Sequence, residues 1–240
     1  MFKTFFIDNG SFVNYGSEHY LSVSICLILG ILFIYFSKNH QSSRQQQVSI
    51  TIFCFFLLFS QLAKVIIKLC LGVFDYQEDL PLHLCNMLPF IIPFALYFKN
   101  RAVWAVLFLW IIAGTFQSLI TPTLKDSFPH YEFFRYWIVH CGLVIAALYP
   151  IFVWGFKIKF KDVIAGTIAM NVLAFVMYFI NLLLESNYMY MQAKPAGDTI
   201  YNLLGPWPWY LLSLEVVMGV LFFILYVPFL VISRVEISRK

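Results

Sequence analysis

The chain has 240 residues, of which 61% are hydrophobic and 12% are charged, and its mean hydropathy is +0.80. Soluble domains carry about 25% charged and about 45–50% apolar residues, so this composition excludes an ordinary soluble globular protein. The net charge of +4 does not indicate nucleic-acid binding, because the basic residues fall in loops and near helix ends rather than in one groove. We therefore expect a membrane protein with no nucleic-acid partner.

Seven apolar runs follow one another along the chain, and each is long enough to cross a hydrocarbon core of roughly 30 Å as a helix. The second run is longer than the others, which predicts a tilted helix or one that extends past the interface. Seven spans and short loops use up the chain, so we expect an all-α, seven-transmembrane-helix bundle that forms a single domain over residues 1–240. The predicted helices cover about residues 20–36, 48–74, 80–98, 103–119, 133–155, 163–184 and 210–233.

The basic residues predict the orientation of these spans. The side formed by the second, fourth and sixth loops has few of them, namely Lys125 and Lys194, together with Lys3 before the first span, and its second loop carries Asp75, Glu78 and Asp79. By the positive-inside rule, the N-terminus lies outside and the C-terminus in the cytoplasm, in a multi-pass protein of the cell membrane. Ten basic residues lie on the cytoplasmic side: Lys38, Arg44, Lys99, Arg101, Lys157, Lys159, Lys161, Arg234, Arg239 and Lys240.

Two segments on the predicted outer side, 121–132 and 185–209, are longer than a connection needs. The second ends in Gly205-Pro206-Trp207-Pro208-Trp209-Tyr210, whose prolines prevent a helix from beginning before Trp209. An aromatic belt with turn residues accounts for most of this composition. A lid over an outward-facing site is the functional alternative.

Polar side chains inside the predicted spans gather in their outer halves. Ionisable groups in a membrane cost several kcal/mol and usually face the protein interior or a wet cavity. Gln61, Lys64 and Lys68 recur on one face of the second helix, and His140 lies roughly 10 Å below the outer end of the fifth. We predict one polar cavity open to the outer leaflet or just beneath it. Its predicted substrate-binding residues are Lys64, Lys68, His83, Asn86, Gln117, Asn181, Trp209 and Glu215.

An unpaired charge in this cavity would be expensive, so we expect Lys64 or Lys68 to pair with Glu215. For single residues such as Asn171 and Gln117, the alternative is a hydrogen bond that joins two helices. The five cysteines all fall inside apolar runs, which favours individual thiols over a disulfide framework.

Cys85 and His140 form the candidate catalytic pair. A thiol beside an imidazole can transfer acyl groups, because the base takes the thiol proton and the thiolate attacks an ester carbonyl. Burial raises the pKa of a thiol, so a nearby lysine or protonated histidine is needed to lower it. Backbone amides freed around Pro81 and Pro89, or the side chain of Asn86, could bind the developing oxyanion. Inert packing is the alternative for the cysteine, and a hydrogen bond between helices for the histidine.

A zinc site built from His83, Cys85 and His140 is disfavoured. His83 and Cys85 are two residues apart, about 200° around a helix, so they cannot face one point on a regular helix. Cys141 points about 100° away from His140 and is a poorer partner for the same imidazole. We expect no metal ion and no cofactor.

Several motifs in this order resemble the YwaF-like integral membrane protein family of bacteria, relatives of the animal transmembrane protein 164. The resemblance covers roughly residues 15–235, and the Gly-Pro-Trp-Pro-Trp-Tyr run is its most specific part. The other motifs are Leu80-Pro81-Leu82-His83-Leu84-Cys85-Asn86, Phe128-Pro129-His130, His140-Cys141-Gly142, Asn187-Tyr188-Met189-Tyr190 with Lys194-Pro195, and Glu215.

This resemblance implies a reaction. The animal branch is described as a lipid acyltransferase that moves a fatty acyl chain between phospholipids with a catalytic cysteine and histidine. By motif, these residues would be Cys85 and His140. The expected function is therefore a membrane-embedded lipid acyltransferase or transacylase with membrane lipids as its partners.

A transporter or solute-binding protein with the same outward-facing cavity is the alternative. Pro81, Pro89 and Pro93 give the third predicted helix the broken character of many transporter helices. The absence of an internal repeat and of polar residues leading to the inner face counts against it. A sensory receptor is a third reading, for which the number of spans alone is weak evidence.

Overall fold

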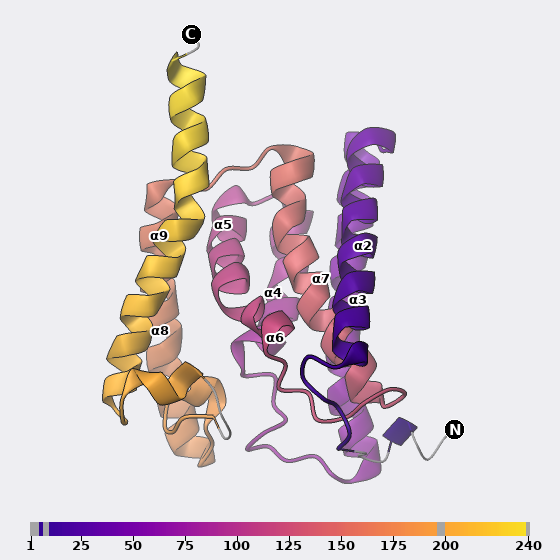
Figure 1. The fold of residues 1–240 in the computed structure, drawn as a ribbon, viewed down its shortest axis with the longest axis vertical. Coiled ribbons are helices and arrows are strands. Elements are labelled where there is room, and N and C mark those ends of the chain that lie inside the picture. The colour runs from indigo at the N-terminus through magenta and orange to yellow at the C-terminus, as the bar shows by residue number, and fades with distance from the viewer. Residues whose placement is uncertain (1–4, 7–9, 196–199, 239–240) are drawn as a thin grey trace.

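The computed structural model describes residues 5–6, 10–195 and 200–238, and every regular element within these ranges is helical. The main helices are α2 (Ser17–His40), α3 (Ser43–Leu71), α4 (Leu84–Tyr97), α5 (Arg101–Trp110), α7 (Tyr131–Trp154), α8 (Phe160–Leu184) and α9 (Trp209–Ser238). They run up and down along one long axis, so the molecule has two distinct ends (Figure 1). Helices α2, α3 and α7 pack together at one edge, α8 and α9 form the other edge, and α4 and α5 lie between them.

Six helical stretches are long and apolar enough to cross a membrane, and they match six of the seven predicted runs. The remaining run, predicted over 80–98, contains α4, an apolar helix of 14 residues. At 1.5 Å per residue α4 reaches only about 21 Å. It begins late because residues 80–83 form a turn, in which Leu82 N–H bonds to Leu80 C=O, and His83 is the N-cap residue.

The predicted fourth helix has an irregular outer part. After α5 the chain makes a π-helical turn, η1 (Ile111–Thr115), followed by the short helix α6 (Gln117–Ile120). A π-helical turn adds a residue to the helical repeat and often occurs at functional sites. Here it turns the fully buried Thr115 into the interior of the bundle.

A packed apolar core joins α3, α4, α5 and α7. Ile50, Trp104 and Tyr149 are fully buried in it. Gly142 permits a close approach of α3 and α7, because a Cβ atom at this position would lie 2.3 Å from Leu57 Cδ2. This core forms a rigid support beneath the polar residues at the end where α7 begins.

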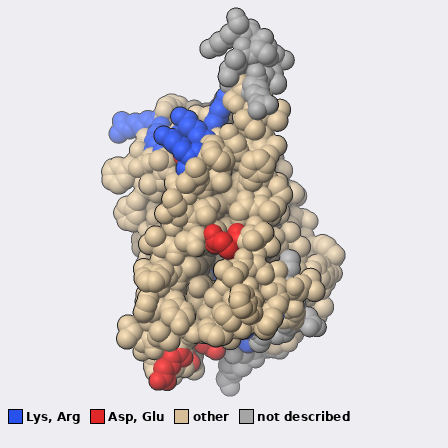
Figure 2. All heavy atoms as spheres, turned by 90° about the vertical axis from the view of Figure 1, so that its left-hand side faces the viewer, with Lys and Arg blue, Asp and Glu red and all other residues tan. Residues whose placement is uncertain are grey.

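The two ends of the molecule differ in charge. Lysine and arginine side chains gather near the end of α9, and acidic side chains show at the opposite end (Figure 2). At the basic end, Arg101 binds Asp162 through two hydrogen bonds of 2.6 and 2.8 Å and ties the start of α5 to the start of α8. Because the helices run alternately up and down, the loops rich in lysine and arginine come together at one end of the molecule.

Helix ends have local causes. Helix α3 ends at Leu71 because Gly72 adopts a left-handed conformation with φ of 69°, so the predicted second run extends three residues too far, to 74. Helix α9 begins at Trp209, as the prolines before it predicted.

Candidate functional site

Two lysines of α3 share one buried carboxylate. Asp79 Oδ1 lies 2.5 Å from Lys68 Nζ and 3.6 Å from Lys64 Nζ, and Asp79 is 3% exposed. Burial alone raises the pKa of Asp79, but hydrogen bonds from Lys68 and from the backbone N–H of Asp75, together with the charge of Lys64, bring the pKa below its usual value. The predicted pairing with Glu215 is therefore wrong. The acid comes from the loop between α3 and α4, which folds back over the end of α3.

A second ion pair lies on the first turns of α7. Arg135 Nε donates to Glu132 Oε2 over 2.7 Å, and its Nη1 donates to Oε1 of the fully buried Gln61 over 3.1 Å. Among the residues that the structure describes, Gln61 Nε2 and Glu132 Oε1 are buried without a hydrogen-bond partner. With Lys64, Lys68 and Asp79, this region holds three cations and two carboxylates.

Sequence reasoning missed Glu132 and Arg135. The signal was present, because Glu132, Tyr136 and His140 follow one another at intervals of four residues and lie on one face of α7. Arg135 joins this face from the neighbouring position, three residues after Glu132.

His140 is 5% exposed and its tautomer is set by the helix itself. Its Nδ1 lies 2.8 Å from the carbonyl oxygen of Tyr136. A carbonyl oxygen only accepts hydrogen bonds, so Nδ1 carries the hydrogen and the neutral ring has its lone pair on Nε2. The ring of Tyr136 packs against the imidazole, with 4.0 Å between the ring centroids. Nε2 is therefore the atom that can accept a proton.

Cys85 lies in the first turn of α4, where the hydroxyls of Thr115 and Ser118 lie beside its thiol. Apart from the Cys85 thiol beside it, the buried Thr115 Oγ1 has no hydrogen-bond partner among the described residues, so its hydroxyl is available to a bound molecule. Arg135 lies within electrostatic range of both Cys85 and His140, and Tyr136 lies within range of Cys85.

The outer segment after α8 is tied down by Asn181. Its Nδ2 donates to the carbonyl oxygen of Tyr188 over 2.8 Å, and its Oδ1 accepts from the N–H of Tyr188 and the hydroxyl of Ser186. The hydroxyl of Tyr188 in turn donates to the carbonyl oxygen of Tyr76 and accepts from the N–H of Leu80. We call this connection between residues 186–190 and the α3–α4 loop the cover.

His83 belongs to the cover as well. Its Nδ1 accepts a hydrogen bond from the N–H of Met189, and its ring packs against the rings of both Tyr188 and Tyr190. Burial, followed by the positive charge of Lys64, lowers the pKa of His83 to about 4, so the ring is neutral at pH 7. Tyr190 lies within electrostatic range of Cys85.

The other predicted site residues have different surroundings. Asn86 is half-buried on α4, whereas Gln117 is exposed on α6. Trp209 is 63% exposed at the start of α9. Glu215 accepts a hydrogen bond of 2.7 Å from Asn171 and lies between α8 and α9.

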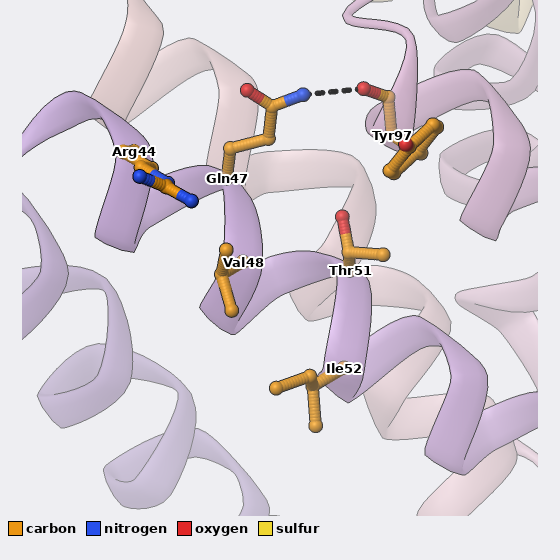
Figure 3. A pocket seen from close by; sticks show the side chains of 6 residues that line it. All are labelled: Arg44, Gln47, Val48, Thr51, Ile52 and Tyr97. Atoms are coloured by element: carbon orange, nitrogen blue, oxygen red, sulfur yellow. Dashed lines mark hydrogen bonds between the residues drawn. The ribbon is translucent and has the colours of Figure 1, made fainter.

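The two hollows that stand out on the surface lie at the basic end. One, of about 260 Å³, lies where α3 begins and α4 ends, and Gln47 crosses it to bond to the carbonyl oxygen of Tyr97 (Figure 3). The other, of about 220 Å³, lies between the start of α8 and the end of α9. Both lie away from the helix ends that carry Cys85 and His140.

Six long apolar helices with polar side chains that bind one another make this chain a multi-pass integral membrane protein. It belongs to the TMEM164 family, whose sequence pattern matches residues 14–226. The chain is similar to an uncharacterized protein of Treponema pallidum (strain Nichols), with 23% identity over 230 residues and 92% of both chains covered. No solved structure matches it significantly.

Proposed function

We propose that this protein is a membrane-embedded lipid acyltransferase or transacylase with Cys85 as nucleophile and His140 as base. The observation that carries the proposal is the tautomer of His140. The Tyr136 carbonyl holds the hydrogen on Nδ1 and leaves Nε2 as a proton acceptor in a buried site. Arg135 lies within electrostatic range of the thiol, and a positive charge there would favour the thiolate that an activated cysteine requires.

The reaction has two steps. His140 Nε2 takes the proton of the Cys85 thiol, and the thiolate attacks the ester carbonyl of a donor phospholipid. The released lysophospholipid hydroxyl receives the proton from the imidazolium, and the acyl chain remains on Cys85 as a thioester. The hydroxyl of an acceptor lysophospholipid then gives its proton to His140 and attacks the thioester, which restores the thiol.

The oxyanion of each tetrahedral intermediate needs hydrogen-bond donors that are already in position. The hydroxyls of Thr115 and Ser118 lie beside Cys85, and the Thr115 oxygen has no other partner among the described residues. Thr115 therefore replaces the backbone amides near Pro81 and Pro89 as the favoured donor. We propose Lys64, Lys68 and Asn86 as substrate-binding residues, and His83 and Asn181 act through the cover.

We further propose that the single domain has seven membrane segments in the cell membrane, with the N-terminus outside and the C-terminus in the cytoplasm. Helix α4 is the short segment of the seven. We count it as a membrane segment because it ends, and α5 begins, at the basic end of the molecule. The concentration of lysine and arginine at that end supports a cytoplasmic location for it (Figure 2). The catalytic pair then lies in the outer half of the bilayer.

Solute binding or transport is the second candidate, and the surplus of cations among Lys64, Lys68, Arg135, Asp79 and Glu132 favours it. A transporter, however, needs a polar route to the other side of the membrane. The packed apolar core fills the half of the bundle toward the basic end, so an enzyme that receives lipid from one leaflet fits the arrangement better.

The test uses the purified full-length protein in lipid vesicles that contain a phospholipid with a labelled acyl chain and an unlabelled lysophospholipid. We expect label to move to the acceptor and a labelled, hydroxylamine-sensitive thioester to form on Cys85. Replacement of the exposed Cys70 by serine is the matched control and should leave the thioester in place. Neither product in the wild-type protein would overturn the proposal.

A further inference from the structure

A polar pair lies in the middle of the apolar α8–α9 face. Asn171 is about 17 Å along α8 from Phe160 and about 20 Å from Leu184. Its Nδ2 donates to Glu215 Oε1 over 2.7 Å and to the carbonyl oxygen of Thr167 over 3.0 Å. Acidic atoms are visible midway between the two ends of this face, surrounded by uncharged residues (Figure 2).

The surroundings of this pair are apolar and exposed. Val172, Phe175 and Val216 are 59%, 66% and 68% exposed, and only 11% of the α9 span and 17% of the α8 span are buried within the chain. Among the described residues, no hydrogen bond engages Glu215 Oε2 or Asn171 Oδ1. Hydrocarbon cannot supply one, so a polar pair facing lipid would be costly.

We propose that the α8–α9 face is the interface with a second copy of this chain, related by a twofold axis along the membrane normal. A twofold interface places the same surface of both copies in contact. A carboxyl group in its acid form has one donor and one acceptor, so Glu215 of each copy can donate to Asn171 Oδ1 of the other. The two unused oxygen atoms thus acquire partners in a symmetric pair.

Gly219 and α2 support this assignment. Gly219 lies one turn after Glu215, and a Cβ atom there would meet nothing within 4 Å, so a second helix can approach the α9 backbone closely. Helix α2 is as exposed as α9, with 11% of its span buried, but its exposed middle carries Leu27, Ile28 and Ile31. Lipid chains can cover such an apolar surface, but they cannot form a hydrogen bond with Glu215. This inference is independent of the proposed acyl transfer.

The test measures energy transfer between donor-labelled and acceptor-labelled copies of the full chain in vesicles over a range of protein-to-lipid ratios. The wild-type protein should exceed the transfer expected for random proximity. Glu215→Gln should dimerise as well, because the amide retains a donor and an acceptor. Glu215→Leu should weaken dimerisation about tenfold or more, since it removes two symmetric intermolecular hydrogen bonds.

Asn171→Leu should give the same loss as Glu215→Leu and shows that the effect does not depend on one substitution. Ser24→Leu, which removes an exposed hydroxyl from α2, is the matched control and should leave dimerisation unchanged. Thermal unfolding of each variant in detergent shows whether the monomer remains folded. Random-level transfer for the wild-type protein, or undiminished transfer for both leucine variants, would overturn the proposal.

Discussion

At the residue scale, the hydrogen bond between His140 Nδ1 and the Tyr136 carbonyl leaves Nε2 as the atom that could act as the proposed base. If Cys85 and His140 act as a unit, Cys85→Ser should fold normally and lose acyl transfer by about 100-fold or more, because a serine hydroxyl is much harder to ionise. His140→Ala should lose a similar factor. The double variant should lose little more, since residues that act together are not additive.

These rates are measured in the vesicle assay, with Cys70→Ser as the control for loss of a thiol. A mild effect of Cys85→Ser together with a strong effect of His140→Ala would contradict a Cys85 nucleophile. It would favour the solute-binding alternative, in which His140 contacts the bound molecule.

Asp79 makes a second prediction at this scale. Asp79→Asn leaves Lys64 and Lys68 without their carboxylate, so we expect a loss of about 1–3 kcal/mol at pH 7, less than for a fully buried pair because Lys68 is 26% exposed. The pKa of Asp79 is lowered by folding, so its stabilisation is complete above the ordinary aspartate value of about 3.9 and is lost as the pH falls below it. Thermal unfolding in detergent should show the gap between wild type and variant closing below about pH 4. A gap that is constant from pH 7 to pH 3 would contradict this assignment.

At the scale of elements, the cover depends on one tyrosine hydroxyl. Tyr188→Phe removes the hydrogen bonds to Tyr76 and Leu80 and leaves their backbone groups without these partners. We expect a loss of about 1–3 kcal/mol in local stability. Hydrogen exchange should then become faster in both residues 75–83 and residues 185–195. Tyr178→Phe, in the last third of α8, is the matched control; equal exchange in the two variants would show that the cover does not depend on Tyr188.

The helices were predictable because the preference of an apolar run for lipid depends on local composition. The late start of α4 was harder to predict from the sequence, because the turn at residues 80–83 depends on contacts with Tyr188, more than 100 residues away. Helical periodicity placed Gln61, Lys64 and Lys68 on one face, but it does not say which neighbour meets that face. For this reason Asp79 was not expected there, and Glu215 was assigned to the wrong group of residues.

At the scale of the whole molecule, the charge difference between its two ends determines how it sits in a membrane. The ends of α2, α4, α7 and α9 lie at the basic end, and the cover lies at the other. If the proposed orientation and the proposed acyl transfer by Cys85 both hold, the lipid substrates come from the outer leaflet.

Cysteine accessibility tests this orientation in intact cells, in a background where the exposed Cys70 is replaced by serine. A membrane-impermeant maleimide should label Lys194→Cys, beside the cover, because the positive-inside rule places that side outside. It should not label Lys99→Cys or Lys38→Cys, at the basic end, until the cells are permeabilised. Lys38 is exposed, so its cysteine reports accessibility without loss of a buried contact. Labelling of positions 194 and 99 alike from outside would contradict a membrane-spanning arrangement in which α4 separates the two sides.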